Sequence, residues 1–251
     1  MPRVLMKRKA EVPYLRALPP FHCMTPVRTV GPHVTLLWGR SGTGKTLYAH
    51  LLGRIFLDKG WEVRYFLTEC LRLGYPYLDG HSIAILSDEH GSNAEKIASF
   101  IQKEMPPNKP SLVIVDSIGE IYGPAEYASR RLGVVLIIHA CIQSWLQNPR
   151  PFYLLLIAQV REAQGRFKVL RPSVAQSLEH SMHVIAHLTD NGFVLDHVVG
   201  RDGIIQQKTY SWVAPEEIVN SLKGAGPLPK RVAEAIQNWE PVEQWGEMEF
   251  V

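Results

Sequence analysis

The stretch from Gly39 to Thr46, which reads GRSGTGKT, constrains the fold more than any other feature of the chain. It matches the pattern G-x-x-x-x-G-K-[ST], the signature of a loop that binds nucleotide phosphates. An apolar stretch rich in strand-forming residues precedes it from Val34 to Trp38, and apolar residues at helical spacing follow it from Leu47 to Phe56. A strand, a glycine loop and a helix in this order predict a phosphate site. A glycine-rich turn with a chance lysine is the less specific alternative.

The chemistry of phosphate binding explains these residue types at this spacing. Gly42 and Gly44 lack a Cβ, so the backbone can curl and direct its N–H groups toward phosphate oxygens. The N-terminus of the following helix adds partial positive charge at the same place. We expect Lys45 to reach the β- and γ-phosphates of ATP and the Thr46 hydroxyl to bind Mg²⁺. The predicted nucleotide-binding residues are Gly39, Arg40, Ser41, Gly42, Thr43, Gly44, Lys45 and Thr46.

Length and composition favour one α/β domain with short appendages, although two small domains also fit 251 residues. The net charge of +3 is too small to demand or to exclude a nucleic-acid partner. The three cysteines, Cys23, Cys70 and Cys141, form no C-x-x-C pair. This spacing favours reduced thiols over a zinc site or a disulfide framework.

The chain shows no signal for export or membrane insertion. Its basic N-terminus lacks the apolar segment of a secretory signal. The longest apolar run, from Leu132 to Ile142, is too short to span a bilayer. We therefore expect a soluble, cytoplasmic protein with no membrane partner.

Two carboxylates follow predicted strands. Glu69 ends the stretch that begins at Trp61, and Asp116 ends the apolar run from Ser111. The carboxyl edge of a parallel sheet is where ligands bind, so Glu69 could orient or deprotonate the water that attacks the γ-phosphate. The Asp116 run has the Walker B pattern, in which a buried strand places a carboxylate beside Mg²⁺. The alternatives are a solvated glutamate and a helix-capping aspartate.

A third polar residue, Gln159, follows the predicted buried strand from Phe152 to Ala158. Its amide could bond a γ-phosphate and respond to its loss, or be satisfied elsewhere. The next stretch, Val160 to Gln176, is basic, since it contains Arg161, Arg166, Lys168 and Arg171 against Glu162. A basic loop beside a phosphate sensor suits a DNA-backbone contact that responds to nucleotide. An ordinary solvated basic loop is the alternative.

A polar stretch precedes a predicted helix in the middle of the chain. Gly119 to Arg131 contains glycine and mixes aromatic with basic side chains, among them Tyr122, Arg130 and Arg131. Leu132 to Leu146 is apolar nearly all round, which predicts a well-buried helix. Further on, Met182–Leu188 and Phe193–Val199 alternate like strands around Asn191-Gly192, a strong hairpin signal.

The ends of the chain differ from its centre in composition. We expect a proline-rich N-terminal arm over residues 1–31, an ATPase core over 32–222, and a linker with an acidic tail over 223–251. The tail carries aromatic residues among its glutamates, so it could dock on a protein partner or compete with DNA for a basic groove. A solvated terminus is the simpler alternative.

In this order the motifs resemble the RecA/RadA recombinase family, most closely its archaeal RadA branch and the bacterial RadA and KaiC relatives. The segment Gly39–Thr46 resembles the family's Walker A motif, and YFLTE, residues 65–69, resembles its second strand with a catalytic glutamate. LVIVDSI, residues 112–118, resembles its Walker B motif. LLIAQV, residues 155–160, is similar to the strand whose glutamine couples nucleotide to DNA. The resemblance covers residues 32–219.

The resemblance implies a RecA-like P-loop NTPase fold of the α/β class, with a mostly parallel twisted sheet and helices on both faces. It implies ATP and Mg²⁺ as cofactors, with Thr46 and Asp116 at the metal. Catalytic roles fall on Lys45, Glu69 and Gln159, and Arg201 could act as an arginine finger toward a neighbouring subunit. Gly119–Arg131 and Val160–Gln176 become the DNA-facing loops, with contacts from Arg130, Arg131, Arg161, Arg166, Lys168 and Arg171.

The function implied first is an ATPase that binds single-stranded DNA in recombination or repair, as a homo-oligomeric ring or filament. It would be a minimal recombinase or a recombination mediator. A hexameric RecA-type DNA helicase is one alternative. A KaiC-like signalling or scaffold ATPase, which binds protein rather than DNA, is another.

Overall fold

The computed structural model describes the central part of the chain and several short segments after it. The described residues are 31–68, 81–84, 93–121, 127–161, 171–172, 181–189, 192–198 and 208–210. Most of the expected N-terminal arm and all of the expected tail lie outside these ranges, as do the candidate residues Glu69, Arg166, Lys168 and Arg201.

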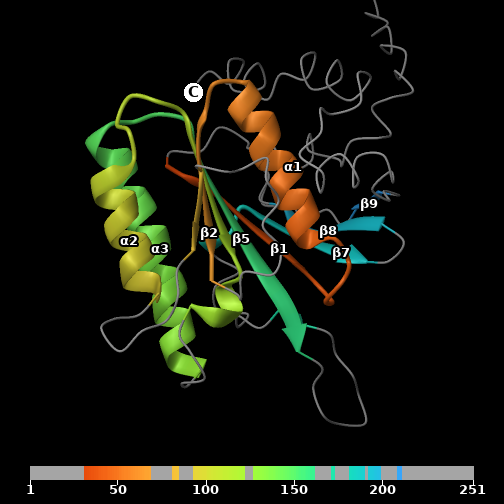
Figure 1. Cartoon of the computed structure of the whole chain (residues 1–251). Helices are drawn as coiled ribbons and strands as arrows, with labels where there is room; N and C mark the ends of the chain where they lie inside the picture. The colour runs from red at the N-terminus through yellow and green to blue at the C-terminus, as the bar shows by residue number, and fades with distance from the viewer. Residues whose placement is uncertain are drawn as a thin grey trace, which may run out of the picture.

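Strands and helices alternate through the first two thirds of the chain (Figure 1). The elements are β1 (His33–Gly39), α1 (Lys45–Asp58), β2 (Glu62–Leu67), β3 (Ser82–Ala84), α2 (Asn93–Glu104), β4 (Ser111–Asp116), the short 3-10 helix η4 (Ile118–Glu120), α3 (Tyr127–Gln147), β5 (Phe152–Arg161), β6 (Arg171–Pro172), β7 (Val184–Thr189), β8 (Gly192–Val198) and β9 (Lys208–Tyr210).

The strands form one sheet with a parallel body and an antiparallel edge. β3, β2, β4, β5, β1 and β7 lie side by side in that order, each parallel to its neighbour. β8 and β9 continue antiparallel from β7, and β6 pairs with the end of β5. Because β1 lies between β5 and β7, the loop that follows it emerges in the middle of the carboxyl edge. That edge is where open α/β sheets bind ligands.

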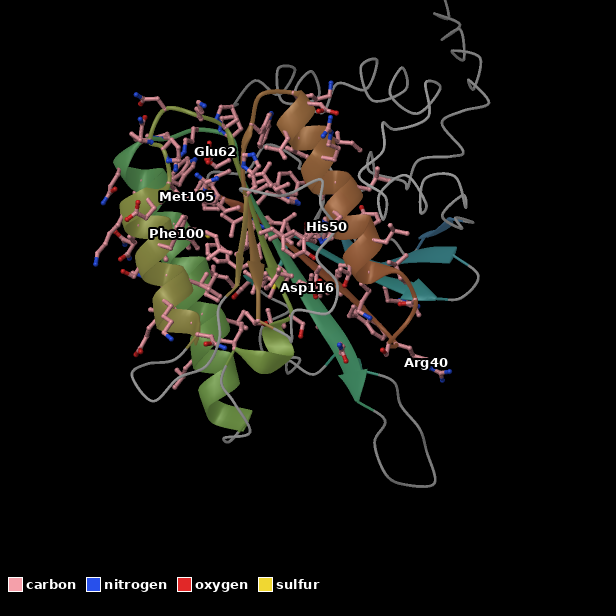
Figure 2. The ribbon with its side chains drawn as sticks, viewed as in Figure 1. Arg40, His50, Glu62, Phe100, Met105 and Asp116 are labelled. Carbon is pink, nitrogen blue, oxygen red and sulfur yellow. The ribbon has the colours of Figure 1, made fainter. Side chains whose placement is uncertain are left out.

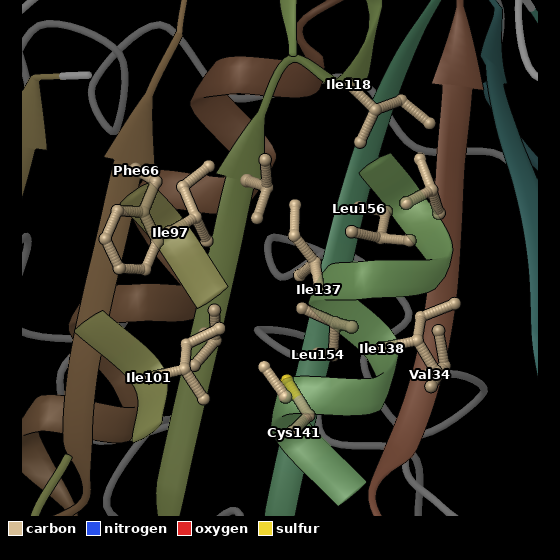
Figure 3. Packing of buried hydrophobic residues seen from close by; sticks show 14 of the residues in the cluster. Val34, Phe66, Ile97, Ile101, Ile118, Ile137, Ile138, Cys141, Leu154 and Leu156 are labelled. Atoms are coloured by element: carbon tan, nitrogen blue, oxygen red, sulfur yellow. The ribbon is translucent and has the colours of Figure 1, made fainter. Parts of the chain in front are cut away.

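Helices cover both faces of the sheet, with α1 on one face and α2 with α3 on the other (Figure 1). The core under α2 and α3 is a continuous apolar layer, in which Phe66, Leu154 and Leu156 of the strands meet Ile97 and Ile137 of the helices (Figure 3). The predicted α/β fold, with a mostly parallel sheet between helices, is confirmed.

Local sequence explains most of these elements. Every residue of β4 is buried, which accounts for its uninterrupted apolar run, since parallel strands are covered on both faces. In α2 the buried residues Ala94, Ile97, Ala98 and Ile101 recur at helical spacing. α1 ends before Gly60, which adopts φ +79° and donates its N–H to the carbonyl of Leu57.

α3 departs from expectation in two ways. It begins at Tyr127, so the residues from Tyr127 to Arg131, including Arg130, are helical and do not belong to the predicted loop. Its polar first turns carry no apolar periodicity, so the helical pattern only becomes visible at Leu132. The helix is also not buried all round: Leu132 is 65% exposed and Leu146 is 57% exposed. α3 packs on the sheet and on α2 with one side, and its other side faces outward.

β5 is longer than predicted. It continues past Ala158 to Arg161, so Gln159 lies inside the strand and not at its end. The extension pairs with β6, with Val160 opposite Pro172 and Arg161 opposite Arg171. Pro172 is tolerated because β6 is a short edge strand. The predicted hairpin is confirmed by the antiparallel pairing of β7 with β8.

Among the described residues, no helix combines the length and the apolar character needed to cross a membrane.

Candidate nucleotide-binding site

The glycines of the GRSGTGKT motif meet two different structural requirements. Gly42 and Gly44 have φ values of +83° and +90°, a left-handed region that side chains with a Cβ rarely adopt. Gly39 is required for space, because a Cβ there would lie 2.6 Å from the carbonyl oxygen of Leu188 in β7. The spacing of the motif predicts only a phosphate-binding role for Gly39. Its packing role depends on β1 and β7 being neighbours.

The ammonium group of Lys45 is hydrogen-bonded to the loop that precedes it. Lys45 is buried, and its Nζ donates a 2.6 Å hydrogen bond to the carbonyl oxygen of Arg40. The hydroxyl of Thr43 donates to the same carbonyl at 3.0 Å. Arg40 itself is exposed at the tip of the loop (Figure 2). The ammonium group is therefore positioned over the loop by a contact that a phosphate oxygen could replace.

The end of α1 that faces the loop suits an anion. α1 begins at Lys45 and its first turn holds no acidic residue. The backbone N–H groups of a first helical turn have no partners within the helix, and they carry the positive end of the helix dipole. The loop and the helix terminus together present the donors that a phosphate group requires.

Asp116 lies at the carboxyl end of β4, beside this helix terminus, and it is only 7% exposed. Its Oδ2 accepts a hydrogen bond from the Thr46 hydroxyl at 2.8 Å and one from the Tyr65 hydroxyl at 2.7 Å. Burial raises the pKa of Asp116 above its ordinary value, whereas the two hydrogen bonds and the positive charge of Lys45 oppose that rise. The structure thus brings together three residues that sequence spacing selected separately: Lys45, Thr46 and Asp116.

The donor set here fits Mg²⁺. A threonine hydroxyl and a carboxylate are oxygen ligands, which Mg²⁺ prefers, and both sit beside the expected phosphate position. Elsewhere in the described part of the chain, no group of three or more His, Cys, Asp or Glu side chains is arranged to hold a metal ion. Thr46 and Asp116 therefore remain the candidates for a metal.

Tyr65 is a site residue that sequence reasoning missed. It is fully buried, and its ring stacks on His50 of α1 with ring centroids 4.4 Å apart (His50 and Asp116 are labelled in Figure 2). The sequence gives one sign of this role, the position of Tyr65 within a strand. Side chains alternate along a strand, so Val63 and Tyr65 lie on the same face of the sheet. Only the pairing of β2 with β4 shows that this face carries Asp116.

The ends of β2 and β4 are tied together. The N–H of Thr68 donates to the carbonyl oxygen of Asp116 at 2.9 Å, and the Thr68 hydroxyl donates to the carbonyl oxygen of Ser117. Glu69 is the next residue in the chain. Its predicted place at the carboxyl edge, close to Asp116, stays a prediction because Glu69 lies outside the described residues.

Gln159 lies directly beside the glycine-rich loop, because it pairs with Gly39 in the register of β5 on β1. Arg161 and Arg171 pair with each other two residues further along β5. Arg130 and Arg131 are in the first turns of α3, which begins after β4 at the same edge of the sheet. Arg166, Lys168 and Arg201 lie outside the described residues, so their predicted roles are untested.

No protein-family model and no curated protein sequence matches this chain. Among solved structures, the crystal structure of the RadB recombinase is similar over 73% of this chain and 89% of that chain. The TM-score is 0.50 and the sequence identity is 18%. The protein has a RecA-like fold. A second solved structure, an ATPase domain, is also similar, with a TM-score of 0.48, 14% identity, and coverage of 72% of this chain and 81% of that chain. Within the RecA-like fold, the loop at Gly39–Thr46 follows a central strand of the sheet.

Proposed function

We propose that this RecA-like chain binds and hydrolyses ATP with Mg²⁺, and that its nucleotide site is coupled to single-stranded DNA. The observation that carries the proposal is the contact between Thr46 and Asp116, 2.8 Å from hydroxyl to carboxylate, beside the buried Lys45. A chance lysine in a glycine-rich turn would not explain why a carboxylate from a separate strand is hydrogen-bonded to the adjacent residue.

Lys45 has the first role in this mechanism. Its ammonium group exchanges the carbonyl oxygen of Arg40 for the β- and γ-phosphate oxygens of ATP, while backbone N–H groups from Gly42 to Thr46 surround the phosphates. Lys45 then lies next to the oxygens on which negative charge develops during phosphoryl transfer. Removing a donor at such a position typically slows a reaction by about 100-fold to 1000-fold.

Thr46 and Asp116 would hold Mg²⁺, which, when bound, offsets negative charge on the phosphate oxygens. Glu69 follows the Thr68 that is hydrogen-bonded to Asp116, so it is suited to orient the attacking water. The water attacks the γ-phosphorus, the bond to the β-phosphate bridging oxygen breaks, and ADP and inorganic phosphate leave.

The coupling to DNA is supported by the course of β5. Gln159 pairs with Gly39 of the phosphate loop, and the strand continues to Arg161, opposite Arg171. Both positions of this pair are basic, and basic side chains are what a contact with DNA phosphates requires. Arg166 and Lys168 lie between these two arginines in the sequence. We therefore assign the stretch from Val160 to Gln176 to DNA binding, with Arg130 and Arg131 of α3 as further contacts.

The finer assignments follow from the same proposal. The protein acts in DNA recombination or repair as a homo-oligomer in which the nucleotide lies at a subunit interface. Arg201 of one subunit reaches the γ-phosphate bound by its neighbour. The acidic tail, which follows the linker within residues 223–251, binds a protein partner or competes with DNA for the basic stretch.

The test is ATP hydrolysis measured with and without single-stranded DNA, at low and at raised salt, with Lys45→Ala as the blank. Stimulation by DNA that weakens as salt rises supports the proposal, because phosphate contacts release counterions. A hydrolysis rate that DNA does not change, together with no DNA binding in the presence of a non-hydrolysable ATP analogue, contradicts the proposed coupling to DNA. That result would favour an ATPase that acts on protein partners.

A further inference from the structure

Asp116 is held by two hydroxyl groups on the same oxygen atom. Thr46 and Tyr65 both donate to Oδ2, at 2.8 Å and 2.7 Å. Oδ1 accepts neither of these two hydrogen bonds. Because a carboxylate has two oxygens in one plane, fixing Oδ2 from two directions also fixes where Oδ1 points.

The ring that delivers the second hydroxyl is itself fixed. Tyr65 is fully buried in β2, and His50 of α1 stacks on it with an interplanar angle of 25°. The contacts therefore form a closed circuit: from Thr46 in α1 to Asp116 in β4, from Asp116 to Tyr65 in β2, and from Tyr65 back to His50 in α1. A change in the position of Asp116 would have to disturb both the helix that follows the phosphate loop and a neighbouring strand.

We propose that Tyr65 is a positioning residue, whose hydroxyl holds Oδ2 of Asp116 so that Oδ1 is presented to the nucleotide-bound metal. This assignment rests on the proposed function. Thr46 donates its hydroxyl hydrogen to Oδ2 and keeps its oxygen lone pairs for the metal, so it holds the carboxylate from one direction only. Tyr65 supplies the second direction from β2, where its ring stacks on His50 of α1.

The expected effect of losing this hydroxyl follows from metal sites in general. Groups that orient a metal ligand without touching the metal typically change metal affinity by about 10-fold to 100-fold when removed. Tyr65→Phe keeps the ring and its stacking on His50 and removes only the donor. Tyr153→Phe is the matched control, because Tyr153 is a buried tyrosine of β5 that packs on Phe56 and His33.

The experiment measures binding of a fluorescent ATP analogue to the full chain, first in EDTA and then across a Mg²⁺ titration. We expect Tyr65→Phe to bind the analogue like the wild type in EDTA. We expect the Mg²⁺ concentration at the midpoint of the affinity gain to rise by about 10-fold, with no change in Tyr153→Phe. A Tyr65→Phe midpoint equal to that of the wild type would overturn the assignment while leaving the proposed function intact.

A second measurement separates positioning from a general loss of structure. In an Asp116→Ala background, Tyr65→Phe should cause no further shift of the Mg²⁺ midpoint, because the group that it positions is gone. A further shift of similar size in that background would overturn the assignment. A wild-type chain whose nucleotide binding ignores Mg²⁺ would overturn both this assignment and the proposed metal site.

Discussion

Gly39 ends β1 beside Leu188 of β7, so closely that a Cβ on Gly39 would lie 2.6 Å from the Leu188 carbonyl oxygen and 2.9 Å from the Thr43 hydroxyl. The first of these contacts is with backbone, which cannot move aside without shifting β7. The segment Gly39–Thr46 therefore depends on the packing of the sheet at its first residue and on left-handed backbone geometry at Gly42 and Gly44.

We expect Gly39→Ala to lower the free energy of unfolding by about 1–3 kcal/mol, since overpacking a dense site costs about this much. Urea denaturation measures it. Lys103→Ala, at an exposed position of α2, is the control and should be nearly neutral. Equal midpoints for wild type and Gly39→Ala would show that β1 and β7 are not packed in this register.

The core beneath α2 and α3 gives a second expectation. Ile97 of α2 is fully buried and lies beside Phe66 of β2 in the apolar core (Figure 3). Ile97→Ala removes buried methyl and methylene groups and leaves a cavity, so we expect a loss of about 2–5 kcal/mol in the free energy of unfolding. Gln102→Ala, at an exposed position of the same helix, should change it little. A similar effect for both variants would contradict the packing of α2 on the sheet.

Buried histidines predict that the protein loses stability in acid. Burial lowers the pKa of His50 from 6.5 to about 3 and lowers the pKa of His33 well below its ordinary value. Below pH 6.5 the unfolded chain takes up a proton at these residues, whereas the folded protein does not. The free energy of unfolding therefore falls as the pH falls, by about 1.4 kcal/mol per pH unit for each such group.

For His50 alone, the loss between pH 6.5 and pH 5 is roughly 2 kcal/mol. Urea midpoints at pH 7 and pH 5 measure it, and His50→Phe, which can keep the stacking on Tyr65, should lose less stability over this range. An unchanged pH dependence in His50→Phe would mean that His50 accepts a proton in the folded state.

The basic stretch after Gln159 predicts a salt-dependent interaction. We expect the double variant Arg166→Glu, Lys168→Glu to bind single-stranded DNA at least about 10-fold more weakly and with a smaller salt slope, since phosphate contacts are lost. The double variant Lys103→Glu, Lys109→Glu, at two exposed positions, is the charge-matched control. Fluorescence anisotropy of a labelled oligonucleotide at several salt concentrations measures DNA binding by both double variants. Equal weakening by the control would point to net charge in place of a local site.

The sequence predicted those parts of the fold whose signals are local. β4 contains the apolar run from Leu112 to Val115, and β5 contains the one from Phe152 to Ala158. The motif at Gly39–Thr46 predicts the strand before the loop and the helix after it. The start of α3 was missed because its first turns, up to Arg131, are polar. Its exposed side was missed because an apolar composition all round the helix does not say which side packs. Among the described residues, α3 packs on α2 and on the sheet with one side, and Leu132 and Leu146 are exposed.

The residues of the candidate site also differ in whether the sequence alone could identify them. Lys45, Thr46 and Asp116 belong to motifs with fixed spacing, so they could be selected without a structure. Tyr65 belongs to no such motif, and its contact with Asp116 depends on the pairing of β2 with β4. Relations between neighbouring strands are set by tertiary packing, which single-sequence patterns do not encode.

The most direct test of the central claim is steady-state release of phosphate from ATP by the wild-type chain and by Lys45→Ala, with Mg²⁺ and with EDTA. We predict hydrolysis that requires Mg²⁺ and falls by about 100-fold or more in Lys45→Ala, because the charge developing on the phosphate oxygens loses its closest cation. Equal rates for the two proteins, or no hydrolysis and no ATP binding by the wild type, would contradict the assignment of Gly39–Thr46 as a catalytic phosphate loop.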